Sequence, residues 1–363
     1  MFKTAVKTFR SVATVTLSLL GLSAGAEDAP PKSLYRLESA LTIPSPNAPN
    51  WDYLTLDPAR GYLYIARRDD GVLIYDTAAK KVAGAIENTK GGNATVLVPE
   101  FDRGYVINED GSTTAFAIST LKTIGRTKIG DDADSAFYDP VTKQLMVTMG
   151  DSHQVLFLDA KTGAVTGKLA IDSSKIEGSA ADGRGGFFTA LRDRNQVIRV
   201  DAREKKITSE WSPQGCALPT AVAFDSANRR VFVGCRGENP ILAVLDADTG
   251  RVVAKPAIGR GNDNIVFDGA AQKIYTANGF DGTLVIIDQV DADTYKLAEA
   301  VTTRPYARTM AVDFKTKKVY LVTAEGTVDP SKPWKAEVAP FYPNTYFRNT
   351  FTLLTYAPRS ANR

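Results

Sequence analysis

The chain has 363 residues, of which 44 are Lys or Arg, 41 are Asp or Glu and one is His. Three of the basic residues and none of the acidic ones lie in residues 1–26, so a chain cleaved there is formally neutral. Neutrality removes the electrostatic basis for binding nucleic acid or an anionic membrane surface. A single imidazole, that of His153, excludes a multi-histidine metal site.

The N-terminal segment has the pattern of a secretory signal peptide. Basic residues in the first ten positions precede an apolar run over residues 12–22, and Ala-Gly-Ala at residues 24–26 follows as a small-residue cleavage site. The apolar run is about half the length that a helix needs to span a bilayer. We therefore predict a signal peptide over residues 1–26 and a mature chain exported to the periplasm or the cell exterior, with no integral membrane segment.

From residue 51 onward, one sequence unit recurs seven times. It consists of an alternating apolar strand that ends in Asp, a short turn, a second apolar strand, and two further strands. The marker Asp stands at Asp57, Asp139, Asp182, Asp225, Asp268 and Asp313, with Pro99 in its place in the second unit. The mean spacing of about 43 residues is that of a four-stranded propeller blade. The sequence therefore predicts an all-β, seven-bladed β-propeller of four-stranded antiparallel blades.

The seventh unit lacks a fourth strand, and the start of the mature chain supplies one. Residues 33–43 form an unassigned alternating strand, whereas only a polar tail at residues 359–363 follows the last repeat. Placing the N-terminal strand at the outer edge of the last blade closes the ring and removes an open sheet edge. We predict a single domain over residues 27–358, with blades near 51–90, 91–132, 133–173, 174–216, 217–261, 262–305 and 306–356, the last completed by residues 33–43.

The only two cysteines, Cys216 and Cys235, lie in the same predicted blade. An even pair in an exported chain forms a disulfide more often than a metal site or a nucleophile. We predict that these two cysteines are joined as a local staple.

The strand and turn sequences resemble the YVTN-type β-propeller repeat of exported bacterial proteins, within the lactonase-like propeller superfamily. The best match is Ile274-Tyr275-Thr276-Ala277-Asn278, followed by Asp-Gly-Thr-Leu at residues 281–284, and Cys216 to Arg236 is also similar. The resemblance implies the fold and a WD40-like repeat architecture. It implies little about function, because related propellers carry unrelated activities.

Candidate binding residues lie where each innermost strand is expected to enter the mouth of the central channel, five residues before the marker. These positions are Asp52, Ala94, Asp134, Glu177, Thr220, Asp263 and Arg308, and Asn93 lies beside one of them. The ends of the second strands add Arg67, Arg68, Arg192 and Arg236. We predict a ligand-binding mouth made of Asp52, Arg67, Asn93, Asp134, Glu177, Arg192, Arg236, Asp263 and Arg308.

Two alternatives stand beside this ligand site. The acids and arginines of the mouth could form only an ion-pair lattice, or a solvated polar rim. The carboxylates could also hold a hard cation such as Ca²⁺, which takes six to eight oxygen ligands. The residues expected for such a metal are Asp52, Glu177, Asn262 and Asp263.

The seventh unit contains an unusually long connection, residues 323–349, rich in aromatic residues and proline. Long connections of this kind are often functional. We predict a lid or partner-docking loop that presents Trp334, Phe341 and Tyr342 at the channel mouth. The alternative is simple packing of this connection over the blade.

The favoured function is a non-catalytic binding module, monomeric, that presents its channel mouth to a small polar or anionic ligand or to a partner protein of the envelope. No cofactor is expected, and Ca²⁺ is the one candidate. The alternative is a lactonase-like hydrolase that uses the metal residues named above. A third possibility is a structural spacer, and a Ser-His-Asp site is conceivable only around His153, whose turn is more typical of an exposed histidine.

Overall fold

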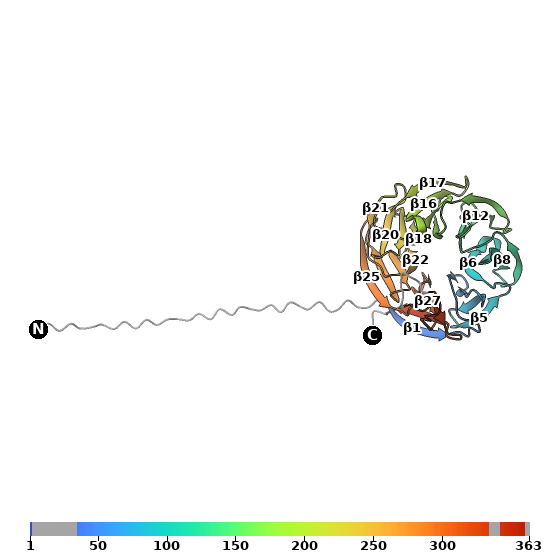
Figure 1. Cartoon of the computed structure of the whole chain (residues 1–363), viewed down its shortest axis with the longest axis horizontal. Coiled ribbons are helices and arrows are strands. Elements are labelled where there is room, and N and C mark those ends of the chain that lie inside the picture. Colours follow the sequence, from blue (N-terminus) through green and yellow to red (C-terminus); the bar gives the residue numbers. More distant parts are fainter. Residues whose placement is uncertain (2–34, 334–341, 360–363) are drawn as a thin grey trace. The chain divides into compact units, whose positions relative to one another are not determined.

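The computed structural model describes Met1, residues 35–333 and residues 342–359. Apart from Met1, the predicted signal peptide lies outside these ranges, as do Trp334 and Phe341. Residues 33–363 form one compact unit. Its described part contains seven four-stranded antiparallel sheets arranged as a ring (Figure 1). The predicted seven-bladed β-propeller is therefore confirmed.

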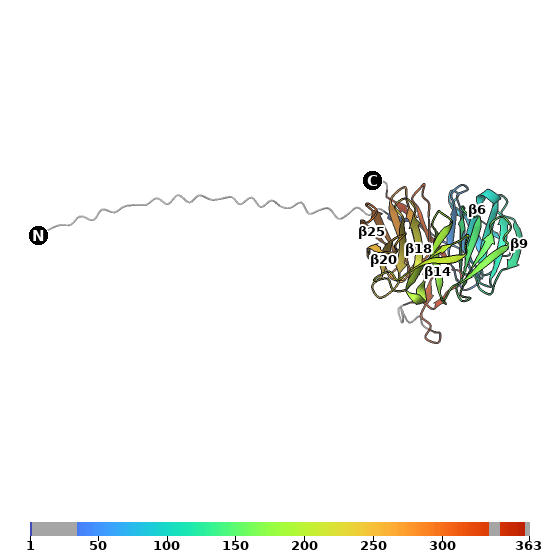
Figure 2. The same cartoon turned by 90° about the horizontal axis from the view of Figure 1, so that it is seen from above.

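Each blade runs from an inner strand near the channel to an outer strand on the rim, as β18 and β21 show in Figure 1. Blades one to three consist of β2 (Leu54–Asp57), β3 (Tyr62–Ala66), β4 (Val72–Asp76) and β5 (Lys81–Ile86); β6 (Gly92–Val98), β7 (Arg103–Asn108), β8 (Ser112–Ala117) and β9 (Thr123–Lys128); and β10 (Ser135–Asp139), β11 (Gln144–Met149), β12 (Gln154–Asp159) and β13 (Val165–Ala170). Blades four to six consist of β14 (Ile176–Ala181), β15 (Gly186–Leu191), β16 (Gln196–Asp201) and β17 (Lys206–Trp211); β18 (Pro219–Asp225), β19 (Arg230–Cys235), β20 (Ile241–Asp246) and β21 (Val252–Ala254); and β22 (Asn262–Asp268), β23 (Lys273–Asn278), β24 (Thr283–Gln289) and β25 (Tyr295–Thr302). Figure 2 shows the same ring edge-on.

The seventh blade joins the two ends of the described chain. It consists of β26 (Met310–Val312), β27 (Val319–Thr323), β30 (Thr352–Pro358) and the N-terminal strand β1 (Tyr35–Thr42). β1 pairs antiparallel with β30 from Tyr35 opposite Pro358 to Thr42 opposite Thr352. The ring is thus closed by the N-terminal strand, as the sequence predicts.

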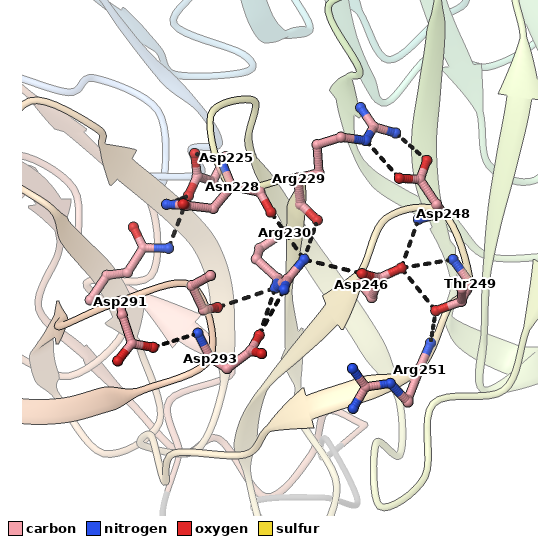
Figure 3. Close-up of polar contacts among 12 residues, drawn as sticks. Asp225, Asn228, Arg229, Arg230, Asp246, Asp248, Thr249, Arg251, Asp291 and Asp293 are labelled. Carbon is pink, nitrogen blue, oxygen red and sulfur yellow. Dashed lines mark hydrogen bonds and ion pairs between the residues drawn. The ribbon is translucent and has the colours of Figure 1, made fainter.

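The recurrent Asp at the end of an inner strand caps the turn that follows it. Asp225 accepts the backbone N–H of Ala227 at 2.9 Å and of Asn228 at 3.2 Å, and Gln289 of the next blade donates to its second oxygen. Figure 3 shows this region, where Arg230 binds both Asp246 of its own blade and Asp293 of blade six. A short polar side chain that binds backbone two residues ahead is the usual reason for Asp in turns.

One assignment within the repeat is wrong. Val98, not Pro99, occupies the marker position in blade two, because Val98 pairs with Arg103 just as Asp268 pairs with Lys273. Pro99 instead begins a 3₁₀ turn over Pro99–Phe101, where its fixed φ and missing N–H are tolerated. The error shifts the expected mouth position of this blade by one residue.

Apolar side chains between neighbouring blades form the core. Phe232 of blade five is fully buried, and its ring centroid lies 5.1 Å from that of Phe267 and 5.9 Å from that of Tyr295 in blade six. Truncating such a ring to alanine typically costs about 3–5 kcal/mol. Blade-to-blade packing therefore fixes how the inner strands are spaced around the channel.

The predicted disulfide is confirmed. Cys216 and Cys235 are bonded, with their Cα atoms 5.1 Å apart. Cys235 ends β19 opposite Pro219, so the bond ties the entry of the inner strand of blade five to the end of its second strand. Structural disulfides are typical of oxidising compartments. Within the described ranges, no helix is long and apolar enough to cross a membrane.

Deleting residues 33–44 should unfold the ring at a markedly lower temperature. The deletion leaves β30 as an exposed edge, and unpaired strand edges promote aggregation. The measurements are the melting temperature and size-exclusion elution. Leu37→Ser, in the same strand and 46% exposed, is the control and should change neither. An unchanged melting temperature and monomeric elution after the deletion would contradict closure by β1.

Candidate functional site

A solvent-open cavity of about 780 Å³ lies at the mouth of the channel. The segments that lead into the inner strands, and the turns between second and third strands, supply its lining. Of the residues expected there, the structure brings together Asp52, Asn93, Asp134, Glu177, Arg192, Arg236, Asp263 and Arg308. A smaller cavity of about 230 Å³ is lined by inner-strand residues and shares Tyr53 and Asp263 with the mouth.

β-Bulges at the start of inner strands set the direction of several mouth side chains. In blade two the register shifts between Gly92 and Ala94, and in blade six between Asn262 and Asn264. The extra residues are therefore Asn93 and Asp263. A bulge re-aims a side chain out of the regular alternation, and both of these residues line the mouth cavity.

Two predicted residues lie elsewhere. Arg67 does not line the cavity; its Nη1 donates to the carbonyl of Pro44 at 3.0 Å, and its guanidinium lies over the ring of Phe351. Its neighbour Arg68 lines the cavity instead, because Arg68 has a left-handed φ of 45° at the turn after β3.

Asn262 also lies outside the mouth lining. Its Nδ2 donates to the carbonyls of Asn264 at 3.1 Å and Ala277 at 3.2 Å. The other three residues of the expected metal set are held by arginines rather than by one another. Among the described residues, no group of three or more His, Cys, Asp or Glu side chains is placed to hold a metal ion.

Arginine–carboxylate pairs organise most of the mouth. Arg68 binds Asp52 at 2.5 Å and Glu109 at 2.9 Å. Arg236 Nη1 lies 3.0 Å from Asp263 Oδ1, and Arg308 pairs with the other oxygen of this carboxylate. This is the ion-pair lattice that the sequence left open as an alternative.

Arg192 and Arg308 make the remaining contacts of the lattice. Arg192 lies 3.5 Å from Glu177 in blade four. Arg308 also lies 3.8 Å from Asp52 and donates to the carbonyl of Trp51 at 2.8 Å, which links blade seven to blade one. Buried pairs of this kind fix geometry more reliably than they add stability.

The carboxyl groups of the mouth respond differently to this lattice. Burial raises the pKa of Asp263, but Arg308 and Arg236 outweigh it and hold that pKa below its ordinary value. Burial raises the pKa of Asp52 despite the opposing effect of Arg308 and Arg68. Burial and the nearby Asp263 carboxylate likewise raise the pKa of Glu177.

Asp134 differs from the other inner carboxylates. Within the described residues, its carboxyl group has neither an ion-pair partner nor a hydrogen bond. Burial, followed by the charges of Asp52 and Glu177, raises its pKa to about 8. The ionised form of Asp134 is therefore disfavoured when the cavity holds no cationic ligand.

Several lining residues escaped the sequence analysis. Phe280 and Tyr306 place their rings 5.0 Å from the guanidinium carbons of Arg236 and Arg308. The others are Tyr53, Glu109, Asp132, Ala133, Gly150, Asp151, Lys175 and Ile176. Most of them lie in turns after second strands or in connections between blades, which a strand-based residue count does not reach.

The long connection of blade seven is anchored beside the mouth. Its ends pair as β28 (Gly326–Thr327) and β29 (Thr345–Tyr346). Tyr342 is buried, donates to the carbonyl of Gly279 at 2.5 Å, and packs against Phe280 and Tyr306. Tyr342 thus supports the wall of the cavity from behind and does not line it.

Comparisons with known proteins support the fold and leave the function open. No family model matches the chain. It is 22% identical over 191 residues to "Uncharacterized protein YncE" of Salmonella typhi and of Salmonella typhimurium strain LT2. This match covers 50% of the chain and 53% of those proteins, so the chain spans about half the length of the curated relatives it matches.

Two solved structures share the architecture. A chain of the Mitotic Checkpoint Complex superposes with a TM-score of 0.70 at 14% identity, over 96% of this chain and 99% of that one. The hydrazine synthase of Kuenenia stuttgartiensis superposes with a TM-score of 0.68 at 14% identity, over 87% and 97%. At this identity the likeness shows the propeller fold alone.

Replacing Asp134 with Asn should stabilise the protein increasingly as pH rises toward about 8. The folded pKa lies above the unfolded one, so the folded state holds the proton more tightly. That contribution to stability is complete below the unfolded pKa and is lost as pH rises through the folded pKa. The variant minus wild-type difference in free energy of unfolding should grow by at most about 1.4 kcal/mol per pH unit in this interval.

The measurement is chemical denaturation of both proteins between about pH 5 and pH 9. Asp151→Asn is the matched control, because the Asp151 carboxylate is 74% exposed and paired with Lys175. A difference between Asp134→Asn and wild type that stays constant across this range would contradict a raised pKa.

Proposed function

We propose that this protein is an exported, non-catalytic binding module that captures a small polar molecule in the mouth of its channel. The observation that carries the proposal is a cavity of about 780 Å³ that is lined mainly by charged side chains, most of which are held by ion pairs with one another. Fixed polar groups around an open concavity are the usual basis of ligand specificity. The N-terminal sequence and the disulfide support export to the periplasm or the cell exterior.

Binding is favoured over hydrolysis by what the inner carboxylates contact. Asp52, Glu177 and Asp263 bind arginines, so a metal ion would have to displace these pairs before it could activate water. The aromatic rings of Phe280 and Tyr306 complete a wall that offers apolar contact beside the guanidinium groups. A lactonase-like hydrolase remains the alternative that the experiment below separates.

Blocking the cavity should abolish ligand binding without unfolding the ring. A Cβ added at Gly150, which lines the cavity, has only the Ile176 carbonyl oxygen within 4 Å, at 3.7 Å. The Cβ of Gly150→Trp therefore meets no clash, and we expect its indole ring to occupy the cavity. Gly84→Trp is the matched control, because Gly84 is exposed on β5 and an added Cβ there meets nothing within 4 Å.

The measurement is a thermal-shift screen of the mature protein against sugars, lactones, nucleotides, amines and divalent metals. A ligand that binds only the folded state raises the melting temperature. We expect compounds that stabilise wild type and Gly84→Trp but not Gly150→Trp. Hits that persist in Gly150→Trp would contradict binding at the mouth. Metal-dependent turnover of a lactone would replace the binding role by hydrolysis.

A further inference from the structure

The charge of the mouth cavity favours a cationic ligand. Its lining contains seven carboxyl side chains against five basic ones, an acidic excess of two when all are ionised. The acidic side chains are Asp52, Glu109, Asp132, Asp134, Asp151, Glu177 and Asp263, and the basic ones are Arg68, Lys175, Arg192, Arg236 and Arg308. An anion entering this cavity meets guanidinium groups already engaged with carboxylates, together with a net like charge.

Among the described residues, the two carboxyl groups of the lining without a cation are Asp132 and Asp134, and Asp132 is held by the backbone N–H of Asp151 and by Ser152 Oγ. All five basic side chains of the lining bind other carboxylates: the arginines bind Asp52, Glu109, Glu177 and Asp263, and Lys175 binds Asp151 at 2.6 Å. In the described part of the chain, none lies within ion-pair distance of Asp134. This carboxyl group therefore lines a cavity without a cation of its own.

Asn93 adds, to the wall that Asp134 lines, a buried acceptor that has no donor within the described ranges. This residue is 2% exposed, and its Nδ2 donates to the carbonyl of Ala133 at 2.8 Å. That bond fixes which side-chain atom is oxygen. The Oδ1 atom is buried and has no donor among the described residues. Because Ala133 immediately precedes Asp134, the two acceptors belong to adjoining parts of the wall.

We propose that the wall formed by Asn93 and Asp134 binds a primary ammonium group of a small organic ligand. This inference rests on the proposed binding function and names the chemistry of its ligand. An ammonium group carries three donors and no acceptor, so it supplies both the charge and the hydrogen bonds that this wall lacks. A ligand carboxylate or phosphate would instead add acceptors to a wall that already has too many.

Proton competition gives the site a distinctive pH dependence. The ammonium group binds the ionised Asp134, whose pKa without ligand is about 8. Binding should therefore strengthen from about pH 6 to about pH 9, where an alkylammonium is still charged. The charged groups that act on Asp134 are the carboxyl groups of Asp52, Glu177 and Asp263 and the cations of Arg68 and Lys175.

The test is isothermal titration calorimetry of the mature protein with four probes. Cadaverine carries ammonium groups on a five-carbon chain, pentanediol and glutarate carry hydroxyl and carboxylate groups on the same chain, and calcium chloride supplies an inorganic cation. We expect cadaverine to bind more tightly than the other three, with affinity that rises with pH.

Asp134→Asn keeps the shape of the side chain and removes its charge. This substitution should weaken the binding of cadaverine at least about tenfold at the higher pH and remove the pH dependence of binding. Asp172→Asn removes one charge at a carboxylate that is 92% exposed, pairs with Arg194 and lies outside the lining, and should change affinity by no more than about twofold. A cooperative melting transition shows that each variant is folded.

Other outcomes overturn the ammonium assignment in distinguishable ways. If glutarate or pentanediol binds more tightly than cadaverine and this binding is lost in Gly150→Trp, the ammonium assignment is wrong but the proposed binding function stands. If calcium displaces cadaverine and calcium binding is lost in Asp134→Asn, the wall is a metal site and the ammonium assignment is wrong. If no heat of binding is detected with cadaverine, the ammonium assignment is also wrong. The proposed function still stands if the thermal-shift screen finds another ligand whose binding is abolished in Gly150→Trp.

Discussion

The antiparallel pairing of β1 with β30 is the constraint on which the rest of the structure depends. Seven blades that pack face to face leave two exposed faces unless the first and last blades meet, and the last blade lacks its outer strand unless the ends of the chain pair. The pairing of Tyr35 with Pro358 through Thr42 with Thr352 joins those ends. Once the ring is closed, the inner strands are held at fixed spacing, and the residues that open them surround one axis.

Closure places many charged groups in a small volume, and the pattern of pairing decides their chemistry. Arg308 shows this most directly, because it contacts Asp263 of blade six and both Asp52 and the Trp51 carbonyl of blade one. Such links hold the mouth rigid and neutralise most of its carboxylates. The acids outnumber the bases by two, however, and of the two carboxyl groups without a cation, Asp132 accepts hydrogen bonds whereas Asp134 has no such partner among the described residues. The proposed preference for an ammonium group rests on this imbalance.

The fold could be predicted from the sequence because the turn chemistry repeats. An Asp that caps the turn after an inner strand, as Asp225 does, recurs at nearly constant spacing and marks the blades. Blade two breaks the rule because Val98 ends the strand and a 3₁₀ turn replaces the cap, which displaced the expected marker to Pro99. The disulfide was predictable because the chain offers only two cysteines.

The site was harder to predict because backbone geometry within single turns decides it. Arg67 and Arg68 are adjacent and chemically identical, yet only Arg68, which has a left-handed φ, lines the cavity. Asn262 and Asp263 likewise differ in position because Asp263 is the extra residue of a β-bulge, and no pattern in the sequence predicts that bulge. Cavity residues such as Phe280 and Tyr306 lie in connections, where no strand pattern gives a position.

The proposed ligand preference depends on the Asp134 carboxyl group having no cationic partner, and the titration of this group can be observed directly. The measurement is the ¹³C chemical shift of the Asp134 side-chain carboxyl carbon, followed against pH in ligand-free mature protein and assigned by its loss in Asp134→Asn. An Asp134 carboxyl group that is buried without a cation should titrate with a midpoint near 8. A midpoint near the ordinary aspartate value of about 4 would show that a cation already neutralises this carboxylate, and would contradict the account.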